Sequence, residues 1–135
     1  MTPTGSDIVL VDSNIWIDFL TLPSSPGGSE LADLVRRRIA ATTGIVSVEI
    51  LYGSASEQAY ERLAALMSQV HFLNTTQAVW DTVAKLSFGL KRSGEMLSLP
   101  DLIISAVALE YGCPLFTRDR AFERVSGLNL YAPSR

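Results

Sequence analysis

The chain is poor in the residues on which several large classes of protein depend. Its 135 residues include one cysteine and one histidine, so neither an internal disulfide nor a zinc site built from Cys and His clusters is expected. No apolar stretch approaches the ~20 residues that a membrane-spanning helix needs. The N-terminal residues also lack the basic and apolar segments of a signal peptide. We therefore expect a cytoplasmic protein without a membrane span.

The charge balance is slightly acidic, with 11 basic residues, 14 acidic residues and a net charge of −3. This argues against non-specific binding of nucleic acid through bulk positive charge. It does not exclude a nucleic-acid substrate, because acids clustered at a metal site lower the total charge while the bound metal restores positive charge locally.

Length and pattern indicate one domain over residues 1–135, with a flexible tail at residues 1–6. Short apolar runs alternate with segments of helical periodicity, which is typical of an α/β domain with a mainly parallel sheet flanked by helices. About five strands are expected, at residues 7–11, 45–47, 70–73, 114–117 and 128–131. Helices are expected from Ser13 through Phe19 and at residues 29–41, 48–52, 57–68, 76–92, 101–111 and 121–125.

Four acidic residues lie where a short apolar run gives way to a helix or a turn, namely Asp12, Glu49, Asp101 and Asp119. If the runs before Asp12, Glu49 and Asp119 are parallel strands, their acids emerge at the carboxyl edge of the sheet, where open α/β sheets bind ligands. Carboxylates gathered there repel one another unless protons or a divalent cation neutralise them. The pattern therefore predicts a metal site, and oxygen ligands without a Cys/His cluster favour Mg²⁺ or Mn²⁺.

Each of these acids, taken alone, has a simpler structural explanation. Asp12 could end a strand, and Asp119 could cap a short helix. Glu49 and Asp101 could gain from the dipole at a helix N-terminus. These explanations do not account for the whole set at the ends of the most apolar segments, where burial of a charge without a partner is costly.

Polar neighbours of the acids are candidates for a supporting role. Ser13 and Asn14 follow Asp12, and Thr117 precedes Asp119 by two residues. Hydroxyl and amide groups at such positions orient carboxylates or metal-bound water. Ser13 could equally cap a helix, and packing is the preferred interpretation of Ser105.

Two arginines flank Asp119 and are candidates for phosphate contacts, because a guanidinium binds phosphate through paired hydrogen bonds. They are Arg118 and Arg120, and they could equally lie on a solvated turn. The run of arginines at residues 36–38 favours a cation cluster at a helix C-terminus over an RNA-facing patch.

The remaining conspicuous residues favour structural roles. His71 is interpreted as a hydrogen-bonding residue at a strand edge, and Cys113 as a small buried hydrophobic residue. The aromatic residues at helical positions are interpreted as core or dimer contacts; they are Trp16, Phe19, Tyr52 and Trp80.

Taken together, four segments resemble a PIN-domain ribonuclease and, more narrowly, the VapC-type toxins of bacterial type II toxin–antitoxin pairs. The resemblance extends from Val9 to about Pro133, in the order and spacing of that family. It departs at residues 103–105, where the family more often has Ala-Leu-Ile-Ala, and nothing transfers to the loop at residues 22–29. The four segments are residues 11–14, 47–53, 101–108 and 116–122.

The resemblance implies a three-layer α/β/α domain and cleavage of RNA with Mg²⁺ or Mn²⁺ as cofactor. It implies a homodimer and a cognate VapB-type antitoxin as the protein partner. In the implied reaction, metal-bound water hydrolyses an RNA phosphodiester. The implied catalytic and metal-binding residues are Asp12, Glu49, Asp101 and Asp119, with Ser13 and Thr117 in support.

Three other interpretations stay open from the sequence. A PIN-domain nuclease could mature RNA instead of acting as a toxin. A haloacid-dehalogenase-like phosphatase would also place an aspartate after its first strand, but Asn14 stands where its Asp-x-Asp pattern needs the second acid. A binding module could hold the metal structurally without turnover.

Overall fold

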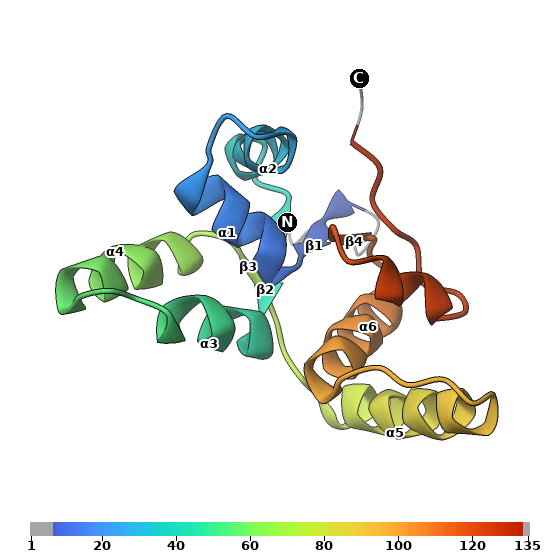
Figure 1. The fold of residues 1–135 in the computed structure, drawn as a ribbon. Coiled ribbons are helices and arrows are strands. Elements are labelled where there is room, and N and C mark those ends of the chain that lie inside the picture. Colours follow the sequence, from blue (N-terminus) through green and yellow to red (C-terminus); the bar gives the residue numbers. More distant parts are fainter. Residues whose placement is uncertain (1–6, 134–135) are drawn as a thin grey trace.

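The computed structural model describes residues 7–133 and contains a parallel sheet between helices (Figure 1). Its strands have the order β3-β2-β1-β4, and every neighbouring pair is parallel. The expected α/β class is therefore confirmed, whereas the predicted tail at residues 1–6 lies outside the described residues. The strands are β1 (Val9–Val11), β2 (Ala40–Thr43), β3 (His71–Leu73) and β4 (Leu115–Phe116).

Helices connect these parallel strands and cover both sides of the sheet. α5 and α6 pack against each other on one side, and α1 and α2 pack together on the other (Figure 1). None of the helices in residues 7–133 has the length and apolar character that crossing a membrane would take. The helices are α1 (Ser13–Thr21), α2 (Pro26–Arg36), α3 (Gly44–Tyr52), α4 (Glu57–Met67), α5 (Gln77–Arg92), α6 (Leu99–Tyr111) and the 3-10 helix η2 (Arg120–Arg124).

The second strand lies earlier in the chain than predicted. β2 consists of four buried Ala and Thr residues at positions 40–43, whereas residues 45–47, predicted to form a strand, begin α3. Val46 and Ile50 are buried one helical turn apart, so the apolar run forms a helix face although its β-branched residues suggested a strand. The prediction was wrong because packing outweighed intrinsic preference.

The second helix also begins and ends earlier than predicted. α2 begins at Pro26 because the Ser25 hydroxyl accepts a hydrogen bond from the Gly28 amide and proline suits the first helical turn. Residues 40 and 41, predicted to be the end of this helix, lie in β2 instead. The prediction missed the Ser-Pro start signal.

α2 ends in a Schellman motif that turns the chain into β2. The Ile39 amide donates to the Leu34 carbonyl at 3.1 Å, and the Arg38 amide donates to the Val35 carbonyl at 3.0 Å. Arg38 takes the left-handed conformation, with φ of 60°, at the position where glycine is usual.

The predicted fifth strand at residues 128–131 is reduced to one parallel bridge between Leu115 and Leu130. The Leu115 amide donates to the Asn129 carbonyl at 2.9 Å, and the Tyr131 amide donates to the Leu115 carbonyl at 2.7 Å. The C-terminal segment therefore lies beside β4 without continuing as a strand.

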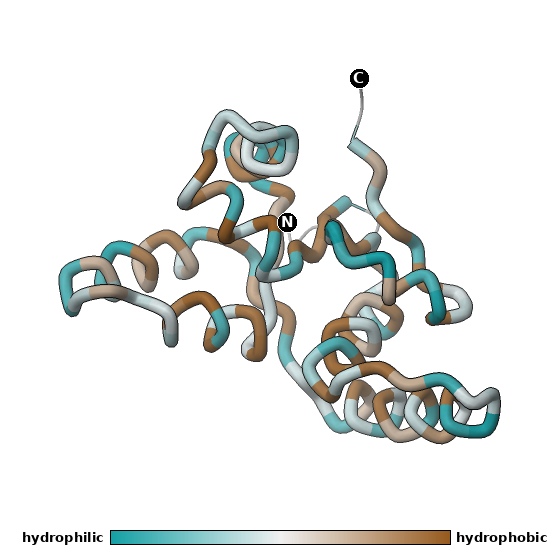
Figure 2. Tube along the Cα trace, in the orientation of Figure 1, coloured by the Kyte–Doolittle hydropathy of each residue, from teal (hydrophilic) through white to brown (hydrophobic). Residues whose placement is uncertain are grey.

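The core lies between the sheet and the helices, and Figure 2 shows apolar residues concentrated along β1 and α6. Trp16 is fully buried, which confirms its predicted core position, whereas Trp80 and Tyr52 are exposed. Cys113 is buried as predicted, and burial raises the pKa of its thiol to about 11. The Ser105 hydroxyl is also buried and has no hydrogen-bond partner among the described residues, which agrees with its interpretation as a packing residue.

Candidate active site

Asp12 lies at the carboxyl end of β1 and caps α1. Its backbone is extended, with φ of −72° and ψ of 158°, and its Oδ1 accepts a hydrogen bond from the Ser13 amide at 2.7 Å. The cap predicted for Ser13 is therefore wrong, because Asp12 is the N-cap and Ser13 is the first helical residue. The Ser13 hydroxyl lies 3.5 Å from the same carboxylate oxygen. Asp12 is only 5% exposed, so its charge is held in a largely dry position.

Thr117 follows β4 and lies beside Asp12 because β1 and β4 are neighbours in the sheet. Its hydroxyl donates to Asp12 Oδ2 at 2.7 Å. The Thr117 hydroxyl oxygen itself accepts from the Asn14 side-chain amide at 3.3 Å and from the Asp119 backbone amide at 3.0 Å. The donor and both acceptor positions of a hydroxyl are thereby used. This geometry favours the supporting role predicted for Thr117.

The other three acids reach the same edge of the sheet from different elements. Glu49 lies in α3, which follows β2 directly. Asp101 lies in the first turn of α6, and its amide donates to the Ser98 hydroxyl at 3.3 Å. Asp119 follows β4 and caps η2, since its Oδ1 accepts from the amide of residue 121 at 2.9 Å.

The carboxylates act on one another electrostatically. Burial raises the pKa of Asp12, hydrogen bonds lower it, and the negative charge of Asp119 raises it. Burial raises the pKa of Glu49, and the charges of Asp12 and Asp101 add to this. Burial also raises the pKa of Asp101, despite a hydrogen bond from Ser98, and the charges of Asp12 and Asp119 add to it. The four acids therefore form one cluster of like charge, which we call the acid cluster.

The acid cluster has donor chemistry that fits a hard divalent cation. The interactions that act on the pKa of Asp12, Glu49 and Asp101 include no positive charge from the described part of the chain. Within residues 7–133, no three acidic, histidine or cysteine side chains already form a metal-binding group. Mg²⁺ does not require one, because it keeps several waters and is usually held by one or two carboxylates.

Comparison with known proteins decides the family. The model of the PIN domain matches residues 9–128. The chain belongs to the PIN-domain family. This assignment favours the nuclease interpretation of the acid cluster over a haloacid-dehalogenase-like phosphatase.

Relatives of this PIN domain are similar along most of their length. Ribonuclease VapC11 of Mycobacterium tuberculosis is 26% identical over 132 residues, which cover 94% of this chain and 98% of that protein. Ribonuclease VapC21 of the same organism is 29% identical over 101 residues, or 73% of each chain. The structure of VapBC2 from Rickettsia felis, bound to a DNA fragment from its promoter, has a TM-score of 0.80 and 22% identity, covering 92% of this chain and 97% of that one. This likeness confirms the expected PIN-like α/β fold.

Both arginines predicted to contact phosphate are paired with acids in this PIN domain. Arg118 Nε lies 2.7 Å from Asp18 Oδ2, and its Nη2 donates to Asp18 Oδ1 at 3.1 Å. Arg120 Nε lies 3.2 Å from Glu123 Oε2 on the surface. Binding of substrate by these arginines stays a prediction.

Sequence reasoning missed two residues that shape the site. The Ser98 cap had a visible signal, because a serine three residues before an acid is a pattern of helix N-termini. Asp18 had none, since it meets Arg118 across a separation of 100 residues that no local pattern reveals.

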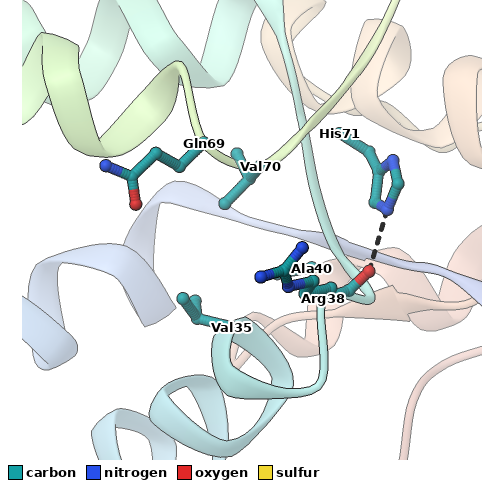
Figure 3. Close-up of a pocket in the computed structure, with 6 residues that line it drawn as sticks. All are labelled: Val35, Arg38, Ala40, Gln69, Val70 and His71. Atoms are coloured by element: carbon teal, nitrogen blue, oxygen red, sulfur yellow. Dashed lines mark hydrogen bonds between the residues drawn. The ribbon is translucent and has the colours of Figure 1, made fainter.

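A separate hollow of about 480 Å³ lies at the opposite, amino edge of the sheet (Figure 3). His71 Nε2 lies 2.9 Å from the Arg38 carbonyl oxygen there, which confirms its predicted hydrogen-bonding role at a strand edge. No member of the acid cluster lines this hollow, so its size does not make it the reactive site. Its lining residues are Val35, Arg38, Ala40, Gln69, Val70 and His71.

Proposed function

We propose that this PIN domain is a metal-dependent endoribonuclease that uses Mg²⁺ or Mn²⁺ and acts as the toxin of a toxin–antitoxin pair. The observation that carries the proposal is the acid cluster at the carboxyl edge of the sheet, where burial and the charges of neighbouring acids raise the pKa of Asp12, Glu49 and Asp101. Relatives that are named ribonucleases support RNA as the substrate. Because the proposed substrate is cellular RNA, we place the activity in the cytoplasm.

The proposed reaction is hydrolysis of an RNA phosphodiester bond by water. When bound, a divalent cation would lower the pKa of a coordinated water and would offset negative charge on the phosphoryl oxygens. In this proposal Asp12 and Asp101 hold the principal cation. Glu49 and Asp119 either complete a second metal position or orient the attacking water.

Hydrogen bonds orient the Asp12 carboxylate for the proposed binding of a cation. Thr117 and Ser13 donate to its two carboxylate oxygens at 2.7 Å, through a hydroxyl and a backbone amide respectively. Donors of this kind favour the ionised carboxylate and fix its direction. The carboxylate can therefore meet a cation without first rotating.

Arg120 is the better candidate for a contact with substrate phosphate. Its side chain is 89% exposed, and its partner Glu123 is itself half exposed, so their ion pair is weak. A phosphate can compete for this guanidinium at little cost.

A VapB-type antitoxin is the proposed protein partner, and a homodimer is the proposed assembly. Proteins of similar fold have been solved as VapBC complexes, among them VapBC2 of Rickettsia felis. Exposed apolar side chains of this chain offer surface for such contacts, including Val48, Tyr52 and Phe88.

A cleavage assay on total RNA tests the nuclease activity. We expect cleavage with Mg²⁺ or Mn²⁺, none with chelator, and none by Asp12→Asn or Asp101→Asn under either condition. Asp81→Asn is the matched control, because Asp81 is an exposed acid on α5 whose side chain accepts a hydrogen bond from Gln77. Metal-independent cleavage, or full activity of Asp12→Asn, would contradict the proposal.

The toxin role is tested in cells. Induced expression of the wild-type chain should stop growth, and co-expression of a small DNA-binding protein encoded beside its gene should restore it. Expression of Asp12→Asn should leave growth unchanged. Normal growth with abundant, active nuclease would indicate an RNA-maturation enzyme instead.

A further inference from the structure

We propose that the ion pair between Asp18 and Arg118 is a clamp that positions Thr117 and Asp119 against Asp12. Asp18 and Arg118 are then positioning residues, and Arg118 is not a substrate contact. This inference rests on the proposed function, because it concerns how the same site is held in shape.

The ion pair has the geometry of a strong contact. Arg118 meets Asp18 through two nitrogens, with Nε 2.7 Å from Oδ2 and Nη2 3.1 Å from Oδ1. The Asp18 side chain is only 14% exposed. A paired, partly dry contact of this kind is stronger and more directional than a solvent-exposed pair.

The clamp holds the loop that carries two residues of the site. Arg118 lies between Thr117 and Asp119, and its backbone amide donates to Asn14 Oδ1 at 3.3 Å. Asn14 and Asp18 lie one helical turn apart on α1, so the loop is fastened to this helix at two points. Because Asp12 is the N-cap of α1, fastening the loop to this helix holds Thr117 and Asp119 beside Asp12.

α2 supports the acidic side of the clamp. Gly27, in the first turn of α2, lies so close that a Cβ atom there would come within 3.1 Å of Asp18 Oδ2. The absence of a side chain at this position leaves the carboxylate room to face Arg118. α1, the first turn of α2 and the loop after β4 therefore meet at this pair.

A phosphate contact for Arg118 would work against this arrangement. Both nitrogens that face Asp18 would have to leave it, and the carboxylate would remain at low exposure without its partner. Leaving the Asp18 carboxylate without a partner is costly at its exposure of 14%, although Arg118 itself is 58% exposed. The exposed Arg120 carries no such penalty.

Kinetics of Asp18→Asn, Arg118→Gln and the double variant test the clamp. We expect each single variant to lower kcat about 10-fold, within the range for loss of supporting partners of a metal site. KM for RNA should stay near the wild-type value, and the double variant should be no worse than either single variant, since both break one contact. A raised KM in Arg118→Gln together with an unchanged Asp18→Asn would overturn the proposal in favour of a substrate contact.

Two further readouts separate the clamp from the nuclease function. Amide hydrogen exchange at Arg118 and Asp119 should speed up in metal-free Asp18→Asn, and the Kd for Mn²⁺ should rise about 10-fold. Unchanged exchange in both single variants would disprove the clamp whatever the enzyme does. If the wild-type protein cleaves no RNA, the function fails while exchange and Mn²⁺ binding still test the clamp.

A pair of glycine substitutions provides a matched control. Gly27→Ala should press on the Asp18 carboxylate, speed exchange at Arg118 and weaken Mn²⁺ binding several-fold. Gly89→Ala makes the same change inside α5, where nothing lies within 4 Å of the new Cβ, and should leave both measurements unchanged. Identical results for the two variants would contradict the part assigned to α2.

Discussion

The two edges of the sheet differ in the charged side chains that gather there. At the carboxyl edge, Asp12 is buried, and burial and the charges of neighbouring acids raise the pKa of Asp12, Glu49 and Asp101. At the amino edge, Arg38 and His71 line an open hollow, and the His71 ring hydrogen-bonds with the backbone carbonyl of Arg38 (Figure 3). A crowd of like charges lowers the stability of the folded state, so such a cluster points to a function. Clustered negative charge, more than cavity size, therefore makes the carboxyl edge the candidate for the active site.

The largest expected effect separates the two edges by activity. Asp12→Asn should lower metal-dependent RNA cleavage by more than the about 100-fold that loss of a supporting partner costs. His71→Gln at the amino edge should leave the rate within about twofold. The measurement is the initial rate of cleavage of one RNA at saturating Mg²⁺. Equal losses of cleavage rate in both variants would show that activity does not depend on the carboxyl edge in particular.

A smaller loss is expected within the carboxyl edge itself. Thr117→Val removes the hydroxyl that donates to Asp12 Oδ2 and should lower activity or Mn²⁺ affinity by about 10- to 100-fold. Thr82→Val is the matched control, because the Thr82 hydroxyl bonds Glu110 on the surface. Titration calorimetry with Mn²⁺ measures the affinity, and normal binding by Thr117→Val would remove this residue from the site.

The raised pKa values at the carboxyl edge should make the stability of the protein depend on pH. The folded-state pKa values of Asp12, Glu49 and Asp101 are raised, so the folded state holds these protons more tightly than the unfolded state. Their contribution to stability is therefore full below the ordinary carboxyl pKa of about 4 and is lost as pH rises through the raised values.

In chelator, the melting temperature of the wild type should therefore fall with rising pH across that window, relative to Asp12→Asn. About 1 kcal/mol corresponds to roughly 4 °C in a domain of this size. Saturating Mg²⁺ should remove the difference, and at neutral pH without metal Asp12→Asn should be as stable as the wild type or more so. Thermal melts that show a destabilised Asp12→Asn in chelator would contradict the like-charge account.

The smallest effect is expected at the amino edge. Arg38 holds a left-handed backbone conformation that costs an L-residue about 1 kcal/mol or more, and glycine adopts it freely. Arg38→Gly should therefore stabilise the protein by up to about 1 kcal/mol in urea unfolding, without changing cleavage. A loss of cleavage in this variant would instead support the RNA-facing patch that was considered for residues 36–38.

The sequence predicts the edge of the sheet at which the four acids lie better than it predicts the strands that lead to that edge. Asp12 and Asp119 were found from strand ends because a buried run followed by an acid is a local pattern. Glu49 was also placed at the correct edge, although the strand before it is β2 and not residues 45–47. The carboxyl edge was reached in either case, since α3 follows β2 without a connecting loop.

What could not be predicted depends on contacts between distant segments. The choice of Ala40–Thr43 as a strand follows from its place between β1 and β3, which a local preference scale does not contain. The contact of Arg118 with Asp18 likewise follows from the pairing of β1 with β4. In both cases, contacts with residues distant in sequence determine the structure, and the local sequence does not reveal them.

The pairing of β1 with β4 also determines when the enzyme can first act. Thr117 is translated 105 residues after Asp12, yet Asp12 accepts a hydrogen bond from its hydroxyl. A nascent chain that still lacks β4 holds Asp12 without this partner. Under the proposed function, a ribosome making this protein is not exposed to a finished nuclease until β4 and the residues that follow it have emerged.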